Sequence, residues 1–408
     1  MTAAASAPRL KHVSVSPFAP ARLGPLTVRN RLIKAATFEG RTRDSQVSPD
    51  LIAFHREIAA GGVGICTVAY CAVSPEGRTD RNALWLRPEI ADDLTALTDA
   101  IHGEGAKAAA QLGHAGPVAN GASNRARALG PSRNPAPLGG TTTRKMTVAD
   151  IATLLANYRR AARLAVDAGF DALELHFGHN YLPSSFLSPL LNRRRDGYGG
   201  SLANRARLCR EIAATVRDEV GPDTALWAKL NLRDGVPGGF DIDESCRVAQ
   251  YLESDGHLDA LEPTVGSSLL NPMYLFHGTP PRREFAAVFD NPMRLGLRIA
   301  GPVFLRHYPY RPGYLQPLAR QLRAAVSMPL ILLGGITDRA SIDAASADGF
   351  DFVALGRALL REPDLPNLIA ADAGHRSRCV HCNQCMPTIY TRTRCPIRTG
   401  ELPDPFVA

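Results

Sequence analysis

Residues 171–205 read DALELHFGHNYLPSSFLSPLLNRRRDGYGGSLANR and contain one complete structural unit of the chain. Residues 171–176 form a short apolar run, which is typical of a buried parallel strand. Several polar side chains follow this run directly. Ser201 then provides a cap residue at which a helix can begin. The segment therefore predicts a strand, a loop that carries chemistry and a helix, in that order.

The same unit recurs along the whole chain. Short β-rich runs alternate with longer stretches of helical period, which is the pattern of βα units in a parallel sheet. Cap residues mark several of the expected helix starts, namely Ser48, Thr147, Ser201, Asp241 and Asp338. The eight expected strands are 31–37, 64–70, 107–112, 171–176, 225–230, 260–264, 330–333 and 352–355.

Eight such units close into one barrel or split between two open sheets, and period alone does not separate these folds. In a barrel the functional residues lie just after the strands, because the eight loops share one face. The candidate residues described below all lie there, so we predict an α/β fold with a single (β/α)8 TIM barrel. We expect an N-terminal extension at 1–24, the barrel at 25–372 and a cysteine-rich segment at 373–408.

Two connections in this pattern are long. They cover residues 113–146 and 265–312 and are rich in glycine and proline. Loops of that length in a compact domain are usually lids or binding loops. We expect the second one to form a wall of the substrate pocket.

His176, His179 and Tyr181 follow the fourth expected strand. Two imidazoles three residues apart at a strand end can both donate a hydrogen bond to one carbonyl oxygen and stabilise negative charge on it. A nearby phenol can supply a proton. A lone histidine at such a place is more often a buried polar group satisfied by its neighbours. The complete set of three favours catalysis.

Glycines follow the last two expected strands. Gly334 and Gly335 come after the seventh, and Gly356 and Arg357 come after the eighth. TIM barrels commonly hold a phosphate group between these two loops, because glycine lets the backbone N–H groups approach it closely. The guanidinium of Arg357 adds a charged fork for phosphate oxygens.

The segment that contains His176, His179 and Tyr181 resembles the Old Yellow Enzyme family of NAD(P)H:flavin oxidoreductases, as do the FLSP and YGG stretches after it. The resemblance extends from about Pro25 to Cys395. It implies non-covalent FMN, NAD(P)H as the electron donor, and hydride transfer to the C=C bond of a small enone-like or enoyl substrate. His176 and His179 then hold the substrate carbonyl, and Tyr181 protonates the α-carbon.

The resemblance also assigns residues to the flavin. Ala36 and Thr37 lie beside it, Gln111 pairs with its pyrimidine edge, and Lys229 stands where the family usually has arginine beside N1 and O2. A lysine in an apolar strand is otherwise unexpected, because lysine is rarely buried without a partner. Asn180 replaces the usual glycine of the family. Asparagine is the residue that next best tolerates a positive φ.

Four cysteines lie close together near the C-terminus: Cys379, Cys382, Cys385 and Cys395. This spacing is compatible with a [4Fe-4S] cluster and resembles the cluster loop of the dienoyl-CoA reductase and trimethylamine dehydrogenase branch of the family. The gaps before the third and fourth cysteines are shorter than in that branch, and only thirteen residues follow Cys395. Zinc bound by four thiolates and four unligated thiols remain alternatives.

The composition excludes other classes of protein. The chain carries 47 lysines and arginines against 39 acidic residues, but no basic run is joined to stacking aromatics, so we expect no nucleic-acid partner. No long apolar run suggests a membrane span. The first dozen residues look like a frayed terminus without a signal peptide, which predicts a cytoplasmic protein.

Two other functions stay open at this level. One is an amine dehydrogenase or demethylase of the same fold, which would release electrons through the cysteine cluster. The other is a flavin-binding redox sensor without turnover, which would need no proton donor such as Tyr181. The physiological substrate, the choice between NADH and NADPH, and the oligomeric state, including a homo-oligomer, are not determined by the sequence.

Overall fold

A computed structural model describes residues 16–291 and 293–406 of the chain. The expected frayed terminus lies outside these residues. Eight parallel strands form the central sheet. They are β3 (Leu32–Lys34), β4 (Ile65–Ala72), β5 (Lys107–Gly113), β10 (Ala172–Phe177), β11 (Ala225–Asn231), β12 (Ala260–Thr264), β13 (Ile331–Leu333) and β14 (Phe352–Leu355).

The sheet closes into a barrel. Each strand pairs with its neighbour in chain order, and β14 pairs back onto β3. A bridge between Leu261 and Leu330 joins β12 to β13, with the Leu261 N–H donating to the Pro329 carbonyl at 3.1 Å. The predicted single (β/α)8 barrel is confirmed. Each of the eight strands lies in its expected run, and none extends more than two residues beyond the carboxyl end of that run.

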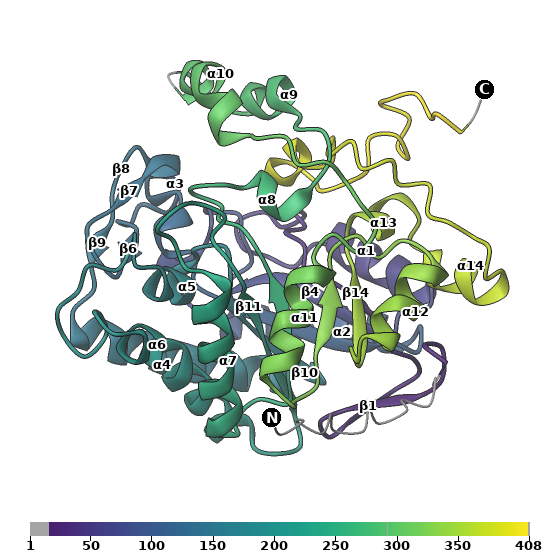
Figure 1. Cartoon of the computed structure of the whole chain (residues 1–408), viewed down its shortest axis with the longest axis horizontal. Helices are drawn as coiled ribbons and strands as arrows, with labels where there is room; N and C mark the ends of the chain where they lie inside the picture. Colours follow the sequence, from purple (N-terminus) through teal and green to yellow (C-terminus); the bar gives the residue numbers. More distant parts are fainter. Residues whose placement is uncertain (1–15, 292, 407–408) are drawn as a thin grey trace, which may run out of the picture.

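Helices follow the strands and surround the barrel (Figure 1). The N-caps predicted at Ser48, Thr147, Ser201, Asp241 and Asp338 each accept a hydrogen bond from the backbone of the first turn. The helices that begin at these caps are α1 (Pro49–Ala60), α4 (Val148–Asp167), α6 (Leu202–Val220), α7 (Ile242–Asp255) and α12 (Arg339–Ala347). The others around the barrel are α2 (Ala91–His102), α5 (Leu182–Leu187), α11 (Gln316–Ala325), α13 (Arg357–Arg361) and α14 (Leu365–Ala371).

The barrel interior has an apolar floor. One buried cluster takes a side chain from every strand of the barrel, and these side chains can meet only inside it: Ile33, Ile65, Ala109, Ala172, Trp227, Ala260, Ile331 and Phe352. The hairpin of β1 (Ala21–Leu23) and β2 (Leu26–Val28) packs on this cluster and closes the amino-terminal end. The domain boundary expected at residue 24 falls inside this hairpin.

The long connections carry small elements over the opposite, carboxyl end. The first holds α3 (Gly121–Asn124) and the two-residue strands β6 (Leu129–Gly130), β7 (Pro135–Ala136), β8 (Thr141–Thr142) and β9 (Arg144–Lys145). The second holds α8 (Met273–Phe276), α9 (Arg282–Ala287) and α10 (Met293–Phe304). Short 3-10 turns are 75–77, 88–90, 116–118, 137–139 and 387–390.

The C-terminal segment crosses the same end of the molecule beside α9 and α10 (Figure 1). The rings of Phe285 and Phe289 contact that of Tyr390, with the Phe289 and Tyr390 centroids 4.9 Å apart. Within the described ranges, no helix is both long and apolar enough to cross a lipid bilayer.

Candidate active site

His176, His179 and Tyr181 form one cluster after β10. The ring centroids of His176 and His179 are 5.1 Å apart, and those of His176 and Tyr181 are 4.6 Å apart. The Nδ1 atom of His176 is buried without a hydrogen-bond partner, whereas Nε2 of His179 lies 2.8 Å from Oγ1 of Thr264. The structure thus brings the three predicted residues together and leaves His176 with an unused ring nitrogen.

The backbone after β10 turns through two residues in the left-handed region. His179 has φ of 59° and Asn180 has φ of 58°. The Asn180 side chain fixes this turn, because its amide donates to Oδ1 of Asp234 at 3.0 Å. The asparagine that replaces the family's glycine therefore adopts the expected positive φ. Tyr181 follows as the N-cap residue of α5.

Burial sets the charge state of this cluster. Burial, followed by the charges of His179 and Lys229, lowers the pKa of His176 well below its usual value. Burial and Lys229 lower the pKa of His179 to about 3. Burial also raises the pKa of Tyr181. At neutral pH both imidazoles are uncharged, so each can donate one N–H, and the phenol keeps its proton.

Lys229 lies deep in the barrel and is not a free cation. Its Nζ is 2.8 Å from Oε1 of Glu174 and also donates to Oε1 of Glu262. Gln111 joins the group, because its amide donates to the same Glu174 oxygen at 3.0 Å. We call these four side chains the lumen network. The sequence predictions included Gln111 and Lys229 but missed the two glutamates.

Ala36 and Thr37 follow β3 and lie near the loop after β14. Oγ1 of Thr37 is buried without a partner, and Ala36 packs beside the cluster that holds Tyr70 and Ala69. A side chain at Gly356 would reach Thr37 at an ordinary contact distance of 3.7 Å. The two segments therefore face each other, and the unpaired hydroxyl and open backbone fit a polar planar cofactor.

Gly334 and Gly335 cannot be replaced without strain. Their φ angles are 102° and 83°, which only glycine adopts readily. A Cβ at Gly335 would lie 2.8 Å from the backbone nitrogen of Gly313. The two glycines let the loop after β13 pack closely against the backbone of Gly313 and the ring of Tyr314.

Arg357 reaches toward the C-terminal segment. Its NH1 donates to the His277 carbonyl at 2.9 Å and to Oδ1 of Asn383. Asn383 lies between two of the clustered cysteines in sequence. One nitrogen of the predicted phosphate ligand is therefore already bonded to the loop that carries the cysteines, a contact that the sequence did not predict.

The four clustered cysteines line one small cavity. Cys379, Cys382, Cys385 and Cys395 surround it together with three arginines, Arg357, Arg361 and Arg378. All eight cysteines of the chain are free thiols. Among the described residues, no three Cys, His, Asp or Glu side chains are gathered closely enough to hold a single metal ion.

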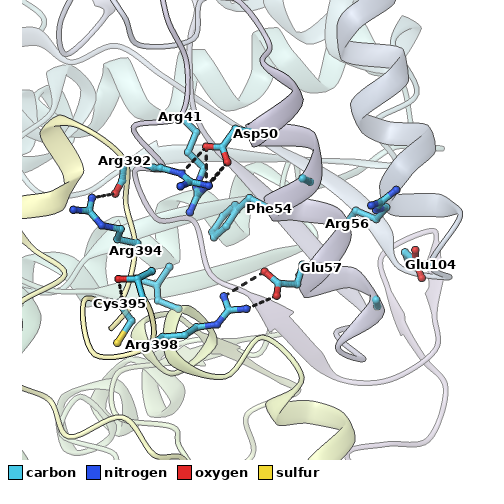
Figure 2. Close-up of a pocket in the computed structure, with 14 residues that line it drawn as sticks. Arg41, Asp50, Phe54, Arg56, Glu57, Glu104, Arg392, Arg394, Cys395 and Arg398 are labelled. Carbon is cyan, nitrogen blue, oxygen red and sulfur yellow. Dashed lines mark hydrogen bonds and ion pairs between the residues drawn. The ribbon is translucent and has the colours of Figure 1, made fainter. Parts of the chain in front are cut away.

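A larger cavity of about 640 Å³ lies between α1 and the C-terminal segment, with Cys395 in its wall (Figure 2). Arg392 and Arg41 both bind Asp50, at 2.5 and 2.8 Å, and Arg398 binds Glu57. These ion pairs hold the C-terminal segment against α1.

The fold and the site together define a class of protein. Reactive side chains gather at the carboxyl ends of the strands of a closed TIM barrel, above a buried cation, as in a cofactor-dependent barrel enzyme. Residues 16–259 match the NADH:flavin oxidoreductase / NADH oxidase family model. The chain belongs to this family and is an NAD(P)H-dependent flavin oxidoreductase.

Known relatives agree with this assignment. The 4,4'-dithiodibutanoate disulfide reductase of Rhodococcus erythropolis is 52% identical over 381 residues, which cover 93% of this chain and 94% of that protein. A 2-naphthoyl-CoA reductase structure superimposes with a TM-score of 0.79 and 25% identity. The old yellow enzyme homologue from Zymomonas mobilis shares the fold, with a TM-score of 0.70, 22% identity, and coverage of 93% of this chain and all of that one.

The alignment with the larger relative is partial. The aligned region covers 95% of this chain but only 58% of the 2-naphthoyl-CoA reductase chain. The membership in the family and the barrel fold follow from these comparisons, whereas the substrate does not.

Proposed function

We propose that the protein is an ene reductase that uses FMN to pass hydride from NAD(P)H to an activated C=C bond. The observation that supports this best is the cluster of His176, His179 and Tyr181, in which one buried imidazole nitrogen has no hydrogen-bond partner among the described residues. Bound FMN supplies the hydride. The remaining chemistry belongs to the side chains of this chain.

The two histidines bind the substrate carbonyl. Because both imidazoles are uncharged, each offers one N–H to the carbonyl oxygen, which gains negative charge as the C=C bond is reduced. Tyr181 keeps its proton at neutral pH and gives it to the adjacent carbon. His179 already contacts Thr264 through Nε2, so its Nδ1 is the nitrogen available to the substrate.

The flavin site is assigned to the residues around the barrel mouth. Thr37 and Ala36 lie along the cofactor, Gln111 pairs with its pyrimidine edge, and Lys229 provides positive charge beneath it. The phosphate binds at the backbone of Gly334, Gly335 and Gly356, with the guanidinium of Arg357. The buried unpaired hydroxyl of Thr37 and the strained glycines support this assignment.

The cysteine cavity is proposed to hold a [4Fe-4S] cluster. A cluster spreads its four thiolate ligands around a core of several atoms, whereas zinc draws four sulfurs to about 2.3 Å from one ion. The four thiols of this chain line one cavity, and their spacing in sequence is compatible with such a cluster. Three arginines around that cavity suit a group of negative charge.

A second substrate class is favoured by one comparison. The relative that is 52% identical over nearly its whole length is a disulfide reductase. Reduction of an organic disulfide takes one hydride and one proton and yields two thiols, so the same hydride source and Tyr181 would serve. We propose small organic disulfides as the alternative substrate.

Half-reaction kinetics decide between these substrates. The purified protein should contain non-covalent FMN and should be reduced anaerobically by NADH or NADPH. The reduced protein is then mixed with enones, nitroalkenes, enoyl thioesters or a disulfide dicarboxylate, and flavin reoxidation is followed. Reoxidation by an enone that slows in Tyr181→Phe supports the ene reductase. Fast reoxidation by the disulfide alone supports the alternative, and release of FAD contradicts the FMN assignment.

The compartment is also a proposal. Eight free thiols suit a reducing environment, where structural disulfides do not form. We therefore propose that the enzyme works in the cytoplasm.

A further inference from the structure

Three ionisable side chains of the lumen network meet inside the barrel, below the two catalytic histidines. Lys229 contacts Glu174 and Glu262, and none of the three side chains is more than 3% exposed. The three residues come from neighbouring strands: Lys229 on β11 is paired with Glu262 on β12, and Glu174 on β10 is paired with Trp227, two residues before Lys229. One cation thus faces two carboxylates, and all three side chains are almost completely buried.

No other charge restores the balance. In the part of the chain that the structure describes, Lys229 is the one cation within ion-pair distance of either carboxylate. From β5 the network receives only the neutral amide of Gln111. From β10 it receives Glu174 and the uncharged His176, and β13, with the sequence ILL, has no ionisable side chain. Among the described residues, Oε2 of Glu174 is buried without a hydrogen-bond partner, and the neutral indole of Trp227 on β11 lies beside Glu262.

An excess carboxylate in such a place favours a proton. Burial and the neighbouring Glu174 raise the pKa of Glu262 to about 7, although Lys229 opposes this shift. Burial works against the charge of Lys229, but the two carboxylates raise its pKa, so it stays charged. Glu262 is thus the member of the network whose charge changes near neutral pH.

We infer that Glu262 takes up a proton from solvent when the flavin is reduced and releases it when the flavin is reoxidised. This inference rests on the proposed function, because it needs FMN bound above Lys229. Negative charge that arrives beside Lys229 competes with Glu262 for the same cation, so the affinity of Glu262 for a proton increases. Glu262 acts through Lys229 and is a positioning residue, since it does not touch the substrate.

The step balances in protons and electrons. Hydride carries two electrons and one proton, so its transfer from NAD(P)H to FMN exchanges no proton with water. Protonation of Glu262 then forms one O–H bond with a proton from solvent. That bond breaks again when hydride passes to the substrate, and the proton returns to solvent.

Proton uptake during anaerobic reduction tests this inference. The holoenzyme is mixed with NADH or NADPH in weakly buffered solution that contains a pH-indicator dye, and protons taken up per FMN reduced are counted. We expect uptake that approaches one proton per FMN at about pH 8, and almost none at about pH 5, where Glu262 is already protonated. Glu262→Gln should abolish the uptake at about pH 8.

Glu39→Gln is the matched control. Glu39 also pairs with a buried lysine, Lys34, but on the outer side of the barrel wall. The Glu39→Gln variant should leave the number of protons taken up per FMN unchanged. A purely structural role for Glu262 would change stability in its variant without changing this count.

The outcomes separate the inference from the function on which it rests. A holoenzyme that is reduced normally but takes up no proton at about pH 8, or a Glu262→Gln variant that takes up as many protons as the parent, overturns the inference alone. A protein that does not bind FMN, or that NAD(P)H does not reduce, overturns both. If Glu262→Gln does not fold, the pH profile of the unmodified enzyme still decides, because uptake that is equal at the two pH values contradicts the inference.

Discussion

Two buried lysines lie on opposite sides of the same barrel wall. Lys34 is on β3 and faces outward to α1, where its Nζ is 2.5 Å from Oε1 of Glu39 and 2.8 Å from the Thr67 carbonyl. Lys229 is on β11 and faces the interior, where it meets both Glu174 and Glu262. The outer lysine has one carboxylate partner, and the inner lysine has two.

The glutamates respond in opposite directions. Burial works to raise the pKa of Glu39, but Lys34 and His55 outweigh it, and the net pKa is lowered. Burial prevails at Glu262, whose pKa is raised to about 7. A balanced buried pair fixes the chain, here the loop between β3 and α1. An unbalanced group keeps a site for a proton, and the difference lies in the count of charges, not in the depth of burial.

Removal of the outer lysine should have the largest effect. Lys34→Met leaves the carboxylate of Glu39 buried without its cation, and we expect a loss of about 3 to 5 kcal/mol in the free energy of unfolding. Denaturant unfolding measures it. Lys229→Met should cost less stability, because Glu262 can be neutralised by a proton. Equal losses in the two variants would contradict the comparison.

Buried histidines also lie on both sides of the wall, His176 and His179 inside and His55 outside. His176→Ala should raise the activation free energy of flavin reoxidation by an enone by about 2.7 to 4 kcal/mol. Flavin reduction should be less affected. His179→Ala should behave alike. His55, which lies against Cys66 and Glu39 on the outer side, is the control: His55→Ala should lower the melting temperature and keep both half-reactions. Stopped-flow kinetics measure both half-reactions. If His176→Ala impaired both equally and also lowered the melting temperature, His176 would have a structural role.

The pH dependence of stability should have opposite signs at the two glutamates. Glu262 has a folded pKa of about 7 against an ordinary value of 4.5, so the folded state binds the proton more tightly and stability falls as pH rises between these values. Glu262→Gln should remove this fall and gain on the order of 2 to 3 kcal/mol above about pH 7.

Glu39 has a lowered pKa, so its contribution is present above pH 4.5 and is lost as pH falls. Glu39→Gln should therefore lose stability at neutral pH and lose little in acid. Denaturant unfolding measured across this pH range checks both signs. If the free energies of unfolding of the two variants changed with pH in the same way, the two glutamates would not differ as proposed.

The smallest effect concerns the flavin potential. Lys229→Met removes positive charge beneath the proposed flavin site and should lower the two-electron potential by about 30 mV, which corresponds to about 1.4 kcal/mol. The effect is moderate because Glu174 and Glu262 already offset much of that charge. Anaerobic redox titration measures it, with Lys34→Met as the comparison that should leave the potential in place. A potential that is unchanged or raised in Lys229→Met would remove Lys229 from the flavin site.

The local parts of the fold were predictable from sequence. Strand runs and helix caps depend on neighbouring residues, so Ser48, Thr147 and Asp338 could be identified as caps without tertiary information. The β1–β2 hairpin was not predicted, because three-residue strands carry almost no periodic signal. Its role at the barrel floor depends on packing with Trp227, far away in sequence.

The lumen network shows what a single strand cannot reveal. The sequence identified Lys229 as a charged residue in an apolar strand. Its partners lie on two other strands and were not predicted. A signal did exist, since Glu174 and Glu262 are also lone charges in apolar strands. Three such anomalies on adjacent strands of one barrel predict a shared site. The contact of Arg357 with Asn383 had no comparable signal, because it depends on where the C-terminal segment crosses the barrel.

The pairing of β14 with β3 also affects how the chain is made. The Arg31 side chain donates to the Asp351 carbonyl at this seam, across 320 residues of sequence. At about 5 to 20 residues per second, the ribosome needs roughly 16 to 64 seconds to synthesise that stretch. During this time the edge of β3 has no partner strand, and unpaired edges bind to other chains. We therefore expect the closure of the barrel to wait until the last strand has been synthesised.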